Sequence, residues 1–360
     1  MRILIDIGHP AHVHFFRYLI RNLERDGHFV KITARDKEVT HALLKAYGFE
    51  YVSRGGLKKS MLKKAFGLFS VDYSLYKIAK EFQADLLLGV HNPYIAHAGT
   101  LSGKPSIIFT DTENVGIASY LTFPFADIIW TPSCFMEKIN PDKQVKFDGF
   151  KELAYLHPNN FQPDYSVIER LGISPGEKFI VVRFISWAAS HDTSLHGIQR
   201  GREIDFIKSL EQYGRVFITS ERPLGDDLEK YRVKVPPEEM HSLLYYADLY
   251  IGEGGTMAAE AAVLGTPSIH VEANSDGIAT GSLSGNFREF RDRYGLLFFY
   301  ADQDEAFSKA VELLRDSRTK EKWKKKRENL LKDKVDVTAW MTDFIERYPV
   351  SYREYRRDHV

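Results

Sequence analysis

Short runs of apolar and β-branched residues alternate with longer amphipathic stretches along this 360-residue chain, from its first residues onward. Residues 3–7 predict a buried strand closed by Gly8, and residues 11–26 predict a helix ended by Gly27. Parallel strands need long crossovers, so this rhythm predicts a parallel sheet covered by helices on both faces. In the first half we also expect a helix at 36–47 and strands at 28–33, 86–88, 106–109, 128–130 and 145–147.

A proline- and asparagine-rich segment, residues 157–163, interrupts this rhythm and suits an interdomain linker. The rhythm restarts with strands expected at 179–182, 216–219, 249–252, 267–271 and 296–299. The chain is therefore predicted to be an α/β protein with two doubly wound, Rossmann-like domains. These are residues 1–156 and 164–335, with a helix and tail at 336–360 returning toward the first domain. Ligands of such sheets bind outside the carboxyl ends of the strands, so we expect the site in a cleft between the domains.

Composition excludes several classes of protein. Lys and Arg number 49, as do Asp and Glu, so the formal net charge of zero gives no support to a dedicated nucleic-acid binder. The single cysteine, Cys134, excludes an intramolecular disulfide framework and any multi-cysteine zinc site. Apolar runs stay far below the roughly 20 residues of a membrane span. We therefore expect a soluble, cytoplasmic protein.

The most informative segment is the glycine turn at residues 252–267. A strand is expected to end at Ile251, and a helix of small residues begins near Thr256. The backbone N–H groups at such a helix start, here behind Gly254 and Gly255, form a site for a diphosphate. Glu260 follows about one turn later, within reach of a sugar hydroxyl pair. The structural alternative is a tight turn whose alanines pack a helix against a sheet.

Gly254-Gly255-Thr256, Glu260 and Gly265-Thr266-Pro267 resemble the nucleotide-sugar motif of GT-B glycosyltransferases, in particular the MurG type. They are also similar to the corresponding segment of the non-hydrolysing UDP-GlcNAc 2-epimerases. Residues 109–116 and 126–132 resemble further MurG-like segments. Nearly the whole chain is similar to the DUF354 family of predicted glycosyltransferases, most clearly at Ile-Asp-Ile-Gly-His-Pro-Ala-His-Val-His, residues 5–14. The resemblance implies that the glycine turn holds the nucleotide diphosphate and that Glu260 binds the ribose.

His9, His12 and His14 lie within six residues, after the first expected strand. No nearby acidic or thiol group completes a tetrahedral metal set, so acid–base or phosphate-contacting work is favoured over metal binding. A structural role suits His14 best. Glu113, with Asp111 as its neighbour, is an alternative base at the edge of the cleft, although each also suits a loop cap. His91, before Asn92 and Pro93, is a further candidate at this edge.

Arg183 and Ser186 follow the strand expected at 179–182, and Ser220 follows the next strand. Each is a candidate contact for the nucleotide-sugar, although the residues here match neither the MurG-like turn nor the epimerase His-Arg-Arg group.

Basic residues form two segments. Lys58, Lys59, Lys63 and Lys64 accompany apolar residues and suit peripheral contact with an anionic membrane at its inner face. The favoured alternative is a solvated helix face whose apolar side packs within the protein. Residues 320–327 predict a charged surface helix.

The resemblance implies a metal-independent glycosyltransferase that uses a nucleotide diphosphate-sugar, with a UDP-sugar as the expected donor and no cofactor. The acceptor is unknown, lipid-linked acceptors are included, and the expected context is cell-surface glycan or glycolipid synthesis. Two alternatives remain open. One is an enzyme similar to the non-hydrolysing UDP-GlcNAc 2-epimerases, and the other is a nucleotide-sugar-binding or assembly protein without turnover. No nucleic-acid partner is expected.

Overall fold

The computed structural model describes residues 1–37, 39–55, 61–113, 116–186, 195–199 and 201–359, and of residues 61–68 the backbone alone. The chain separates into two compact units. Unit 1 comprises residues 1–160 together with 335–360, and unit 2 comprises residues 161–334. Nowhere in the described ranges is a helix both long and apolar enough to cross a membrane.

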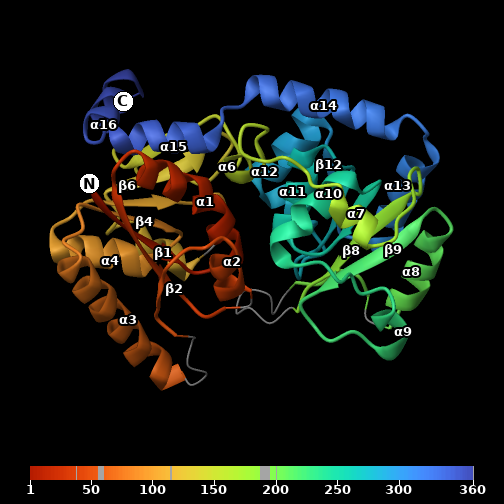
Figure 1. Ribbon diagram of the computed structural model, residues 1–360, viewed down its shortest axis with the longest axis horizontal. Helices are drawn as coiled ribbons and strands as arrows, with labels where there is room; N and C mark the ends of the chain where they lie inside the picture. The colour runs from red at the N-terminus through yellow and green to blue at the C-terminus, as the bar shows by residue number, and fades with distance from the viewer. Residues whose placement is uncertain (38, 56–60, 114–115, 187–194, 200, 360) are drawn as a thin grey trace. The chain divides into compact units, whose positions relative to one another are not determined.

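Unit 1 is built on a seven-stranded sheet in the order β3-β2-β1-β4-β5-β6-β7, in which all neighbours are parallel (Figure 1). The chain runs from β1 outward to β3 and then returns to place β4 on the other side of β1. The six strands predicted here are present, and the two-residue edge strand β3 is an addition. The strands are β1 (Arg2–Ile7), β2 (Phe29–Ala34), β3 (Val52–Ser53), β4 (Leu86–Val90), β5 (Ser106–Phe109), β6 (Ile128–Pro132) and β7 (Gln144–Phe147).

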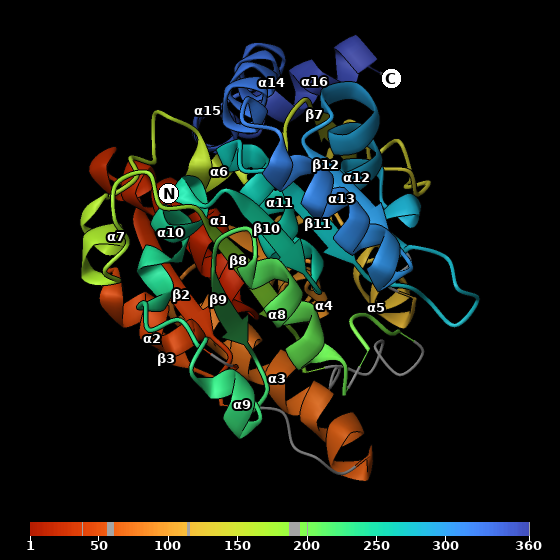
Figure 2. The same cartoon turned by 90° about the vertical axis from the view of Figure 1, so that its right-hand side faces the viewer.

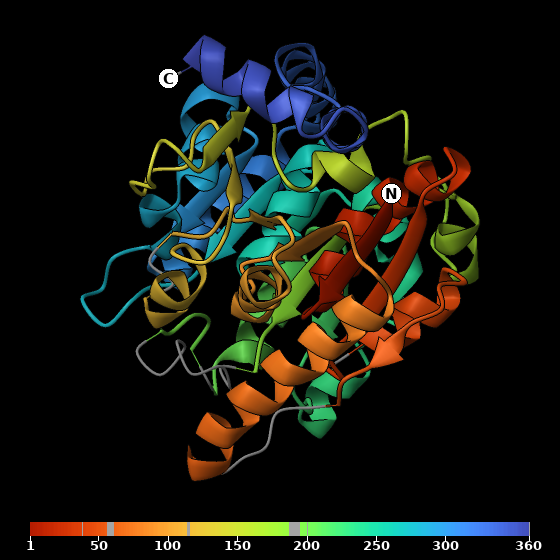
Figure 3. The ribbon, with the colours of Figure 1, turned by 90° about the vertical axis from the view of Figure 1, so that its left-hand side faces the viewer.

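Alternate residues of these strands build separate cores on the two faces of the sheet. On one face Leu4, Leu87 and Ile108 pack against α3 and α4, and Figure 3 shows α3, in orange, crossing this side. The opposite face carries aromatic side chains, including Trp130, which contacts Trp340 of α15 at a ring-centroid distance of 5.1 Å. The helices are α1 (Pro10–Arg25), α2 (Thr40–Ala46), α3 (Met61–Glu81), α4 (Pro93–Ser102), α5 (Ile117–Thr122), α6 (Leu153–Leu156), α15 (Val337–Glu346) and α16 (Val350–His359).

Unit 2 contains a five-stranded parallel sheet in the order β12-β11-β10-β8-β9. Here the chain runs from β8 to the edge strand β9 and returns on the other side of β8 with β10. Two α/β units with parallel sheets confirm the predicted fold class. The strands are β8 (Phe179–Phe184), β9 (Arg215–Ser220), β10 (Leu249–Gly252), β11 (Ser268–Val271) and β12 (Leu297–Tyr300).

Helices cover both faces of this second sheet. α8 and α13 share one face, where the rings of Phe206 and Phe307 lie 6.0 Å apart (Figure 2). α10, α11 and α14 cover the other face, and Arg327 Nε of α14 donates to the Val263 carbonyl of α11 at 2.9 Å. The helices are α7 (Ser166–Arg170), α8 (Glu203–Glu211), α9 (Asp226–Glu229), α10 (Met240–Tyr246), α11 (Gly255–Leu264), α12 (Gly285–Glu289), α13 (Gln303–Arg315) and α14 (Thr319–Asp333), with single turns η1 (Pro237–Glu239), η2 (Thr280–Leu283) and η3 (Phe290–Tyr294).

Each sheet therefore has one point at which the strand order reverses. In unit 1 it lies between β1 and β4, and in unit 2 it lies between β8 and β10. The loops that leave neighbouring strands at such a point diverge to opposite faces, which opens a crevice at the carboxyl ends. Ligands of such sheets typically bind at these positions.

Candidate functional site

The glycine turn of unit 2 lies at the β8/β10 reversal. Gly254 has φ +79°, and a Cβ placed there would lie 2.9 Å from Ile185 Cγ2, so conformation and space both require glycine. α11 begins directly afterwards, at Gly255, and no cap side chain holds its first turn. The positive end of the helix dipole thus points to the carboxyl edge of the sheet.

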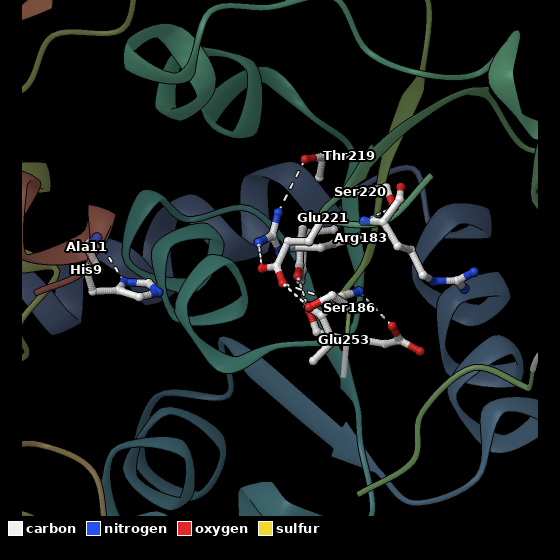
Figure 4. Close-up of polar contacts among 11 residues, drawn as sticks. His9, Ala11, Arg183, Ser186, Thr219, Ser220, Glu221 and Glu253 are labelled. Carbon is white, nitrogen blue, oxygen red and sulfur yellow. Dashed lines mark hydrogen bonds and ion pairs between the residues drawn. The ribbon is translucent and has the colours of Figure 1, made fainter. Parts of the chain in front are cut away.

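Arg183 and Ser186 meet at this edge through the carboxylate of Glu221, which lies directly after β9 (Figure 4). Arg183 forms an ion pair with Glu221 and donates from Nη1 to Thr219 Oγ1 at 3.3 Å. The Ser186 backbone N–H donates to Glu221 Oε2 at 3.3 Å. Glu221 therefore fixes a cation and a loop beside the start of α11.

Ser220, the third candidate after these strands, is engaged in its own turn. Its hydroxyl donates to the Arg222 carbonyl at 2.8 Å and accepts from the Arg222 N–H at 3.2 Å. The residue therefore shapes the loop after β9. Thr256 lies in the first turn of α11 and is partly exposed.

Glu253, next to the glycines, was missed by sequence reasoning. The side chain is fully buried, and its two oxygens accept from the N–H groups of Ile185 and Ile198, each at 2.9 Å. Burial raises the pKa of this carboxyl to about 7, although the two N–H donors act in the opposite direction. An acidic residue inside a glycine turn, directly after a buried strand, is the signal that would have identified it.

Glu260 lies inside α11 and is 4% exposed. Its Oε1 is 3.0 Å from His241 Nε2 of α10, so the carboxylate faces a histidine within unit 2. Any contact with a sugar hydroxyl would share this carboxylate with His241. The glycine turn and Arg183 lie at the carboxyl edge of the sheet, whereas Glu260 is buried one turn behind it.

Unit 1 contains a cavity of about 180 Å³ at its own strand reversal. Its walls come from the carboxyl ends of β1 and β4, from the starts of α1 and α4, from α3, and from the segments after β2 and β3. The residues lining it are Gly8, His12, Arg35, Arg54, Gly55, Val71, Val90, His91, Asn92, Pro93 and Tyr94. Of the proposed catalytic residues, His12 lines this cavity, and His9 and Glu113 do not.

His12 lies half-buried in the first turn of α1. The Gly8 N–H donates to its Nδ1 at 3.3 Å, which assigns the ring proton of the neutral form to Nε2. Burial lowers the pKa of His12 well below 6.5, and His9, Lys151 and Lys37 lower it further. The ring is thus neutral at pH 7 and presents Nε2 as a hydrogen-bond donor.

His9 caps α1, because its Nδ1 accepts from the Ala11 N–H at 3.2 Å (Figure 4). His14 lies on the buried side of the same helix and stacks on Tyr155 with ring centroids 5.4 Å apart. The rings of His9 and His12 lie 5.8 Å apart, whereas His14 packs on the buried side of the helix. Across the described ranges, no group of three or more His, Cys, Asp or Glu side chains is arranged to hold a metal ion.

His91 follows β4 with φ +42°, a left-handed conformation that is uncommon outside glycine. Its Nδ1 lies 2.8 Å from Thr110 Oγ1. Burial lowers the pKa of His91 to about 4. The ring is therefore neutral at physiological pH and is fixed at the wall of the cavity.

The two acidic candidates after β5, Glu113 and Asp111, each contact another residue of unit 1. Glu113 Oε1 accepts from the Met136 N–H at 3.2 Å, and Asp111 pairs with Lys151 Nζ at 2.9 Å. The basic segment expected to contact a membrane lies outside the described part of the chain. Lys58 and Lys59 are not among the described residues, and neither are the side chains of Lys63 and Lys64.

Several solved structures are similar to the whole chain. S. aureus MnaA, in a co-structure with UDP, has a TM-score of 0.66 at 11% identity, covering 96% of both chains. The UDP-GlcNAc 2-epimerase from Methanocaldococcus jannaschii has a TM-score of 0.61 at 13% identity, covering 88% of this chain and 94% of that one. The spinosyn forosaminyltransferase SpnP has a TM-score of 0.64 at 14% identity, covering 96% and 98%. At such identities the likeness shows the fold alone, which these epimerases and glycosyltransferases share.

Sequence comparison reaches closer relatives. An uncharacterized protein of Methanocaldococcus jannaschii, MJ0665, is 24% identical over 277 residues, covering 74% of this chain and 80% of that protein. Residues 1–341 match the family described as "Protein of unknown function (DUF354)". Since this match extends through both units, from β1 to α15, the chain belongs to the DUF354 family.

Proposed function

We propose that the chain is a GT-B-type glycosyltransferase whose donor is a nucleotide diphosphate-sugar, with the diphosphate at the amino end of α11. The supporting observation is the left-handed Gly254 at the β8/β10 reversal, which leads directly into the first turn of α11 beside Arg183. A leaving diphosphate gains negative charge as the glycosidic bond breaks. A helix start and a guanidinium stabilise that charge without requiring a metal ion.

The donor's parts meet different residues in this proposal. The diphosphate competes with Glu221 for Arg183, whose guanidinium is already oriented by that carboxylate. Glu260 binds the ribose, sharing its carboxylate with His241. The solved MnaA structure holds UDP, so a UDP-sugar is the first donor to test.

The acceptor belongs to unit 1 in this proposal. A neutral His12 contacts it from the cavity, either as the base that takes the hydroxyl proton or as an Nε2 donor to an oxygen. His9 and Glu113 are the alternative bases. The protonation at Nε2 favours the donor role for His12, because a base needs an unprotonated nitrogen facing the hydroxyl.

A thermal-shift panel with UDP-, GDP-, dTDP- and CMP-sugars tests donor binding. We expect at least one to stabilise the protein, and we expect Gly255→Ala and Arg183→Gln to weaken that shift severalfold. Arg215→Gln is the matched control, because Arg215 lies at the amino end of β9, where it donates to the Gly172 carbonyl at 3.0 Å. No shift with any nucleotide would contradict the proposal, whereas a shift that persists in Glu260→Ala would remove only the ribose assignment.

Turnover decides the reaction. A transferase consumes the donor only when an acceptor is supplied. Consumption of UDP-GlcNAc alone, with solvent deuterium entering at C2, would replace the transferase by a 2-epimerase. Nucleotide binding without turnover across an acceptor panel would instead indicate a binding protein.

A further inference from the structure

The cavity of unit 1 carries two arginines that the donor proposal does not use. Arg35 follows β2 and Arg54 follows β3, and both line the cavity at the β1/β4 reversal. Arginine is the side chain best suited to hold oxyanions, because its planar fork offers several fixed donors. Two of them at one small cavity require a chemical reason.

Arg54 is held in place by a buried carboxylate. Its Nε and Nη2 donate to Asp6 Oδ1 and Oδ2, both at 2.7 Å, and its side chain is only 7% exposed. Asn92 and Thr33 also donate to Asp6, at 2.5 and 2.6 Å. Arg54 lines the cavity, and its Nη1 makes no hydrogen bond to the described residues.

The floor between the polar groups is Gly8. A Cβ placed on Gly8 would lie 3.8 Å from His12 Nδ1 and 3.9 Å from Arg54 Nη2, so both side chains flank this residue. The His12 ring presents Nε2 as a neutral donor. Lys37 and Lys151 lie near His12, and both disfavour its protonated form.

We propose that this cavity binds a phosphate group, to which Arg35, Arg54 and His12 donate hydrogen bonds. Three donors from separate strand ends suit a tetrahedral oxyanion better than a planar carboxylate. Its volume of about 180 Å³ is several times the roughly 30 Å³ of a water molecule, which is enough for a phosphate and the first atoms of its ester. The binding requires no nucleotide. That the phosphate belongs to the acceptor rests on the proposed function.

Isothermal titration calorimetry of the full-length protein with inorganic phosphate, then with glycerol 3-phosphate, tests the proposal. We expect Arg35→Gln and Gly8→Ala each to weaken binding at least tenfold, the first by removing a cation and the second by filling the floor. Gly8 has no left-handed φ and a Cβ there makes only ordinary contacts, so this variant should fold normally. Unchanged melting temperatures without ligand would verify that.

Two matched controls separate this site from general attraction and from unit 2. Arg25→Gln removes one cation from the far end of α1, where Arg25 pairs with Asp26 at 2.9 Å, and it should leave phosphate binding unchanged. Gly255→Ala alters unit 2 alone and should leave unchanged the component of phosphate binding that Arg35→Gln removes. Equal affinity in the parent, Arg35→Gln and Gly8→Ala, or an equal loss in Arg25→Gln, would overturn the proposal.

Further arms identify the source of the phosphate and separate the two proposals. Binding to glycerol 3-phosphate but not to phosphatidic acid vesicles indicates a soluble ester, and the reverse indicates a lipid headgroup. In either case the proposal requires that Gly8→Ala loses the binding. UDP titrations of the parent protein and the same variants report on unit 2. If the parent protein binds phosphate but does not bind UDP, the donor proposal is rejected and the phosphate proposal is retained.

Discussion

Both units place a fully buried carboxylate at their strand reversal, but they neutralise it differently. In unit 1 the carboxylate is Asp6, which a guanidinium, an amide and a hydroxyl hold from three side chains. In unit 2 it is Glu253, which two backbone N–H groups hold, and no cation among the described residues forms an ion pair with it. One carboxylate orients a cation toward a cavity, whereas the other fixes the backbone on both sides of residues 187–194.

This difference shows how the same position in a fold acquires different chemistry. A side-chain cation beside a carboxylate brings its remaining donors to the ligand, and therefore builds an anion site. Backbone N–H donors satisfy a carboxylate without adding positive charge, so the diphosphate site proposed for unit 2 depends on the helix start and Arg183. The following predictions test that contrast, from the largest expected effect to the smallest.

Removing the unit 1 carboxylate charge should have the largest effect. Asp6→Asn leaves the Arg54 guanidinium buried without a counter-charge, and breaking such a pair costs about 3–5 kcal/mol. Urea unfolding measures the loss. The double variant Asp6→Asn/Arg54→Gln should recover part of it, because no unpaired charge then remains. A single variant as stable as the parent would show that Asp6 does not carry the charge balance of this site.

The two sites should respond to pH in opposite directions. His91 has a pKa of about 6.5 in the unfolded chain, whereas in folded unit 1 its pKa is about 4. The unfolded state therefore binds a proton more readily than the folded state, and unit 1 loses stability as the pH falls from about 6.5 to about 4. Glu253 is protonated in the folded state up to about pH 7 but only to about pH 4.5 when unfolded, so unit 2 gains stability as pH falls. Each effect is at most about 3 kcal/mol.

Native-state hydrogen exchange at pH 5, 6 and 7 measures the two units separately. Amides of β1 and β4 should lose protection at low pH, while those of β10 and α11 should gain it. Glu253→Gln should abolish the second slope. For the first slope His91→Asn is suitable, because asparagine tolerates the left-handed backbone at this position. Parallel slopes in both units would contradict the contrast.

The smallest effect should come from a pair of glycines. Gly254→Ala forces alanine into a left-handed conformation and against Ile185, so we expect a loss of about 1–2 kcal/mol or more. Gly8→Ala meets neither obstacle and should change stability by less than about 1 kcal/mol in either direction. Thermal unfolding of both variants makes the comparison. Equal losses would show that Gly8 is also a conformational requirement.

Much of the fold could be predicted because its signals are local. The apolar runs at residues 3–7 and 249–252 form β1 and β10, and the glycines after the second run produce the turn before α11. Helix ends were less accurate: the helix expected from residue 36 begins at Thr40, whose N–H and hydroxyl both donate to the Lys37 carbonyl. Propensity indicates that a helix forms, whereas such turn contacts decide where it begins.

The residues of the candidate sites also divide into those that local sequence patterns identify and those that only tertiary contacts bring together. Gly254 was identified because a strand, a turn and a helix follow one another in sequence, and His12 because it follows the first strand. Arg54 and Asp6 are 48 positions apart, so no local pattern joins them. Glu253 was missed because its partners, Ile185 and Ile198, are supplied by another strand end and a distant loop.

The sequence by itself determined the periodicity, the parallel strands and the glycine turn, since hydrophobic spacing and backbone conformation act over a few residues. Tertiary structure decided which charges share a site. Strand order brought β1 beside β4 and β8 beside β10, and burial then set the protonation of His12, His91 and Glu253. Desolvation and pairing depend on neighbours from across the sheet, and only the assembled sheet provides them.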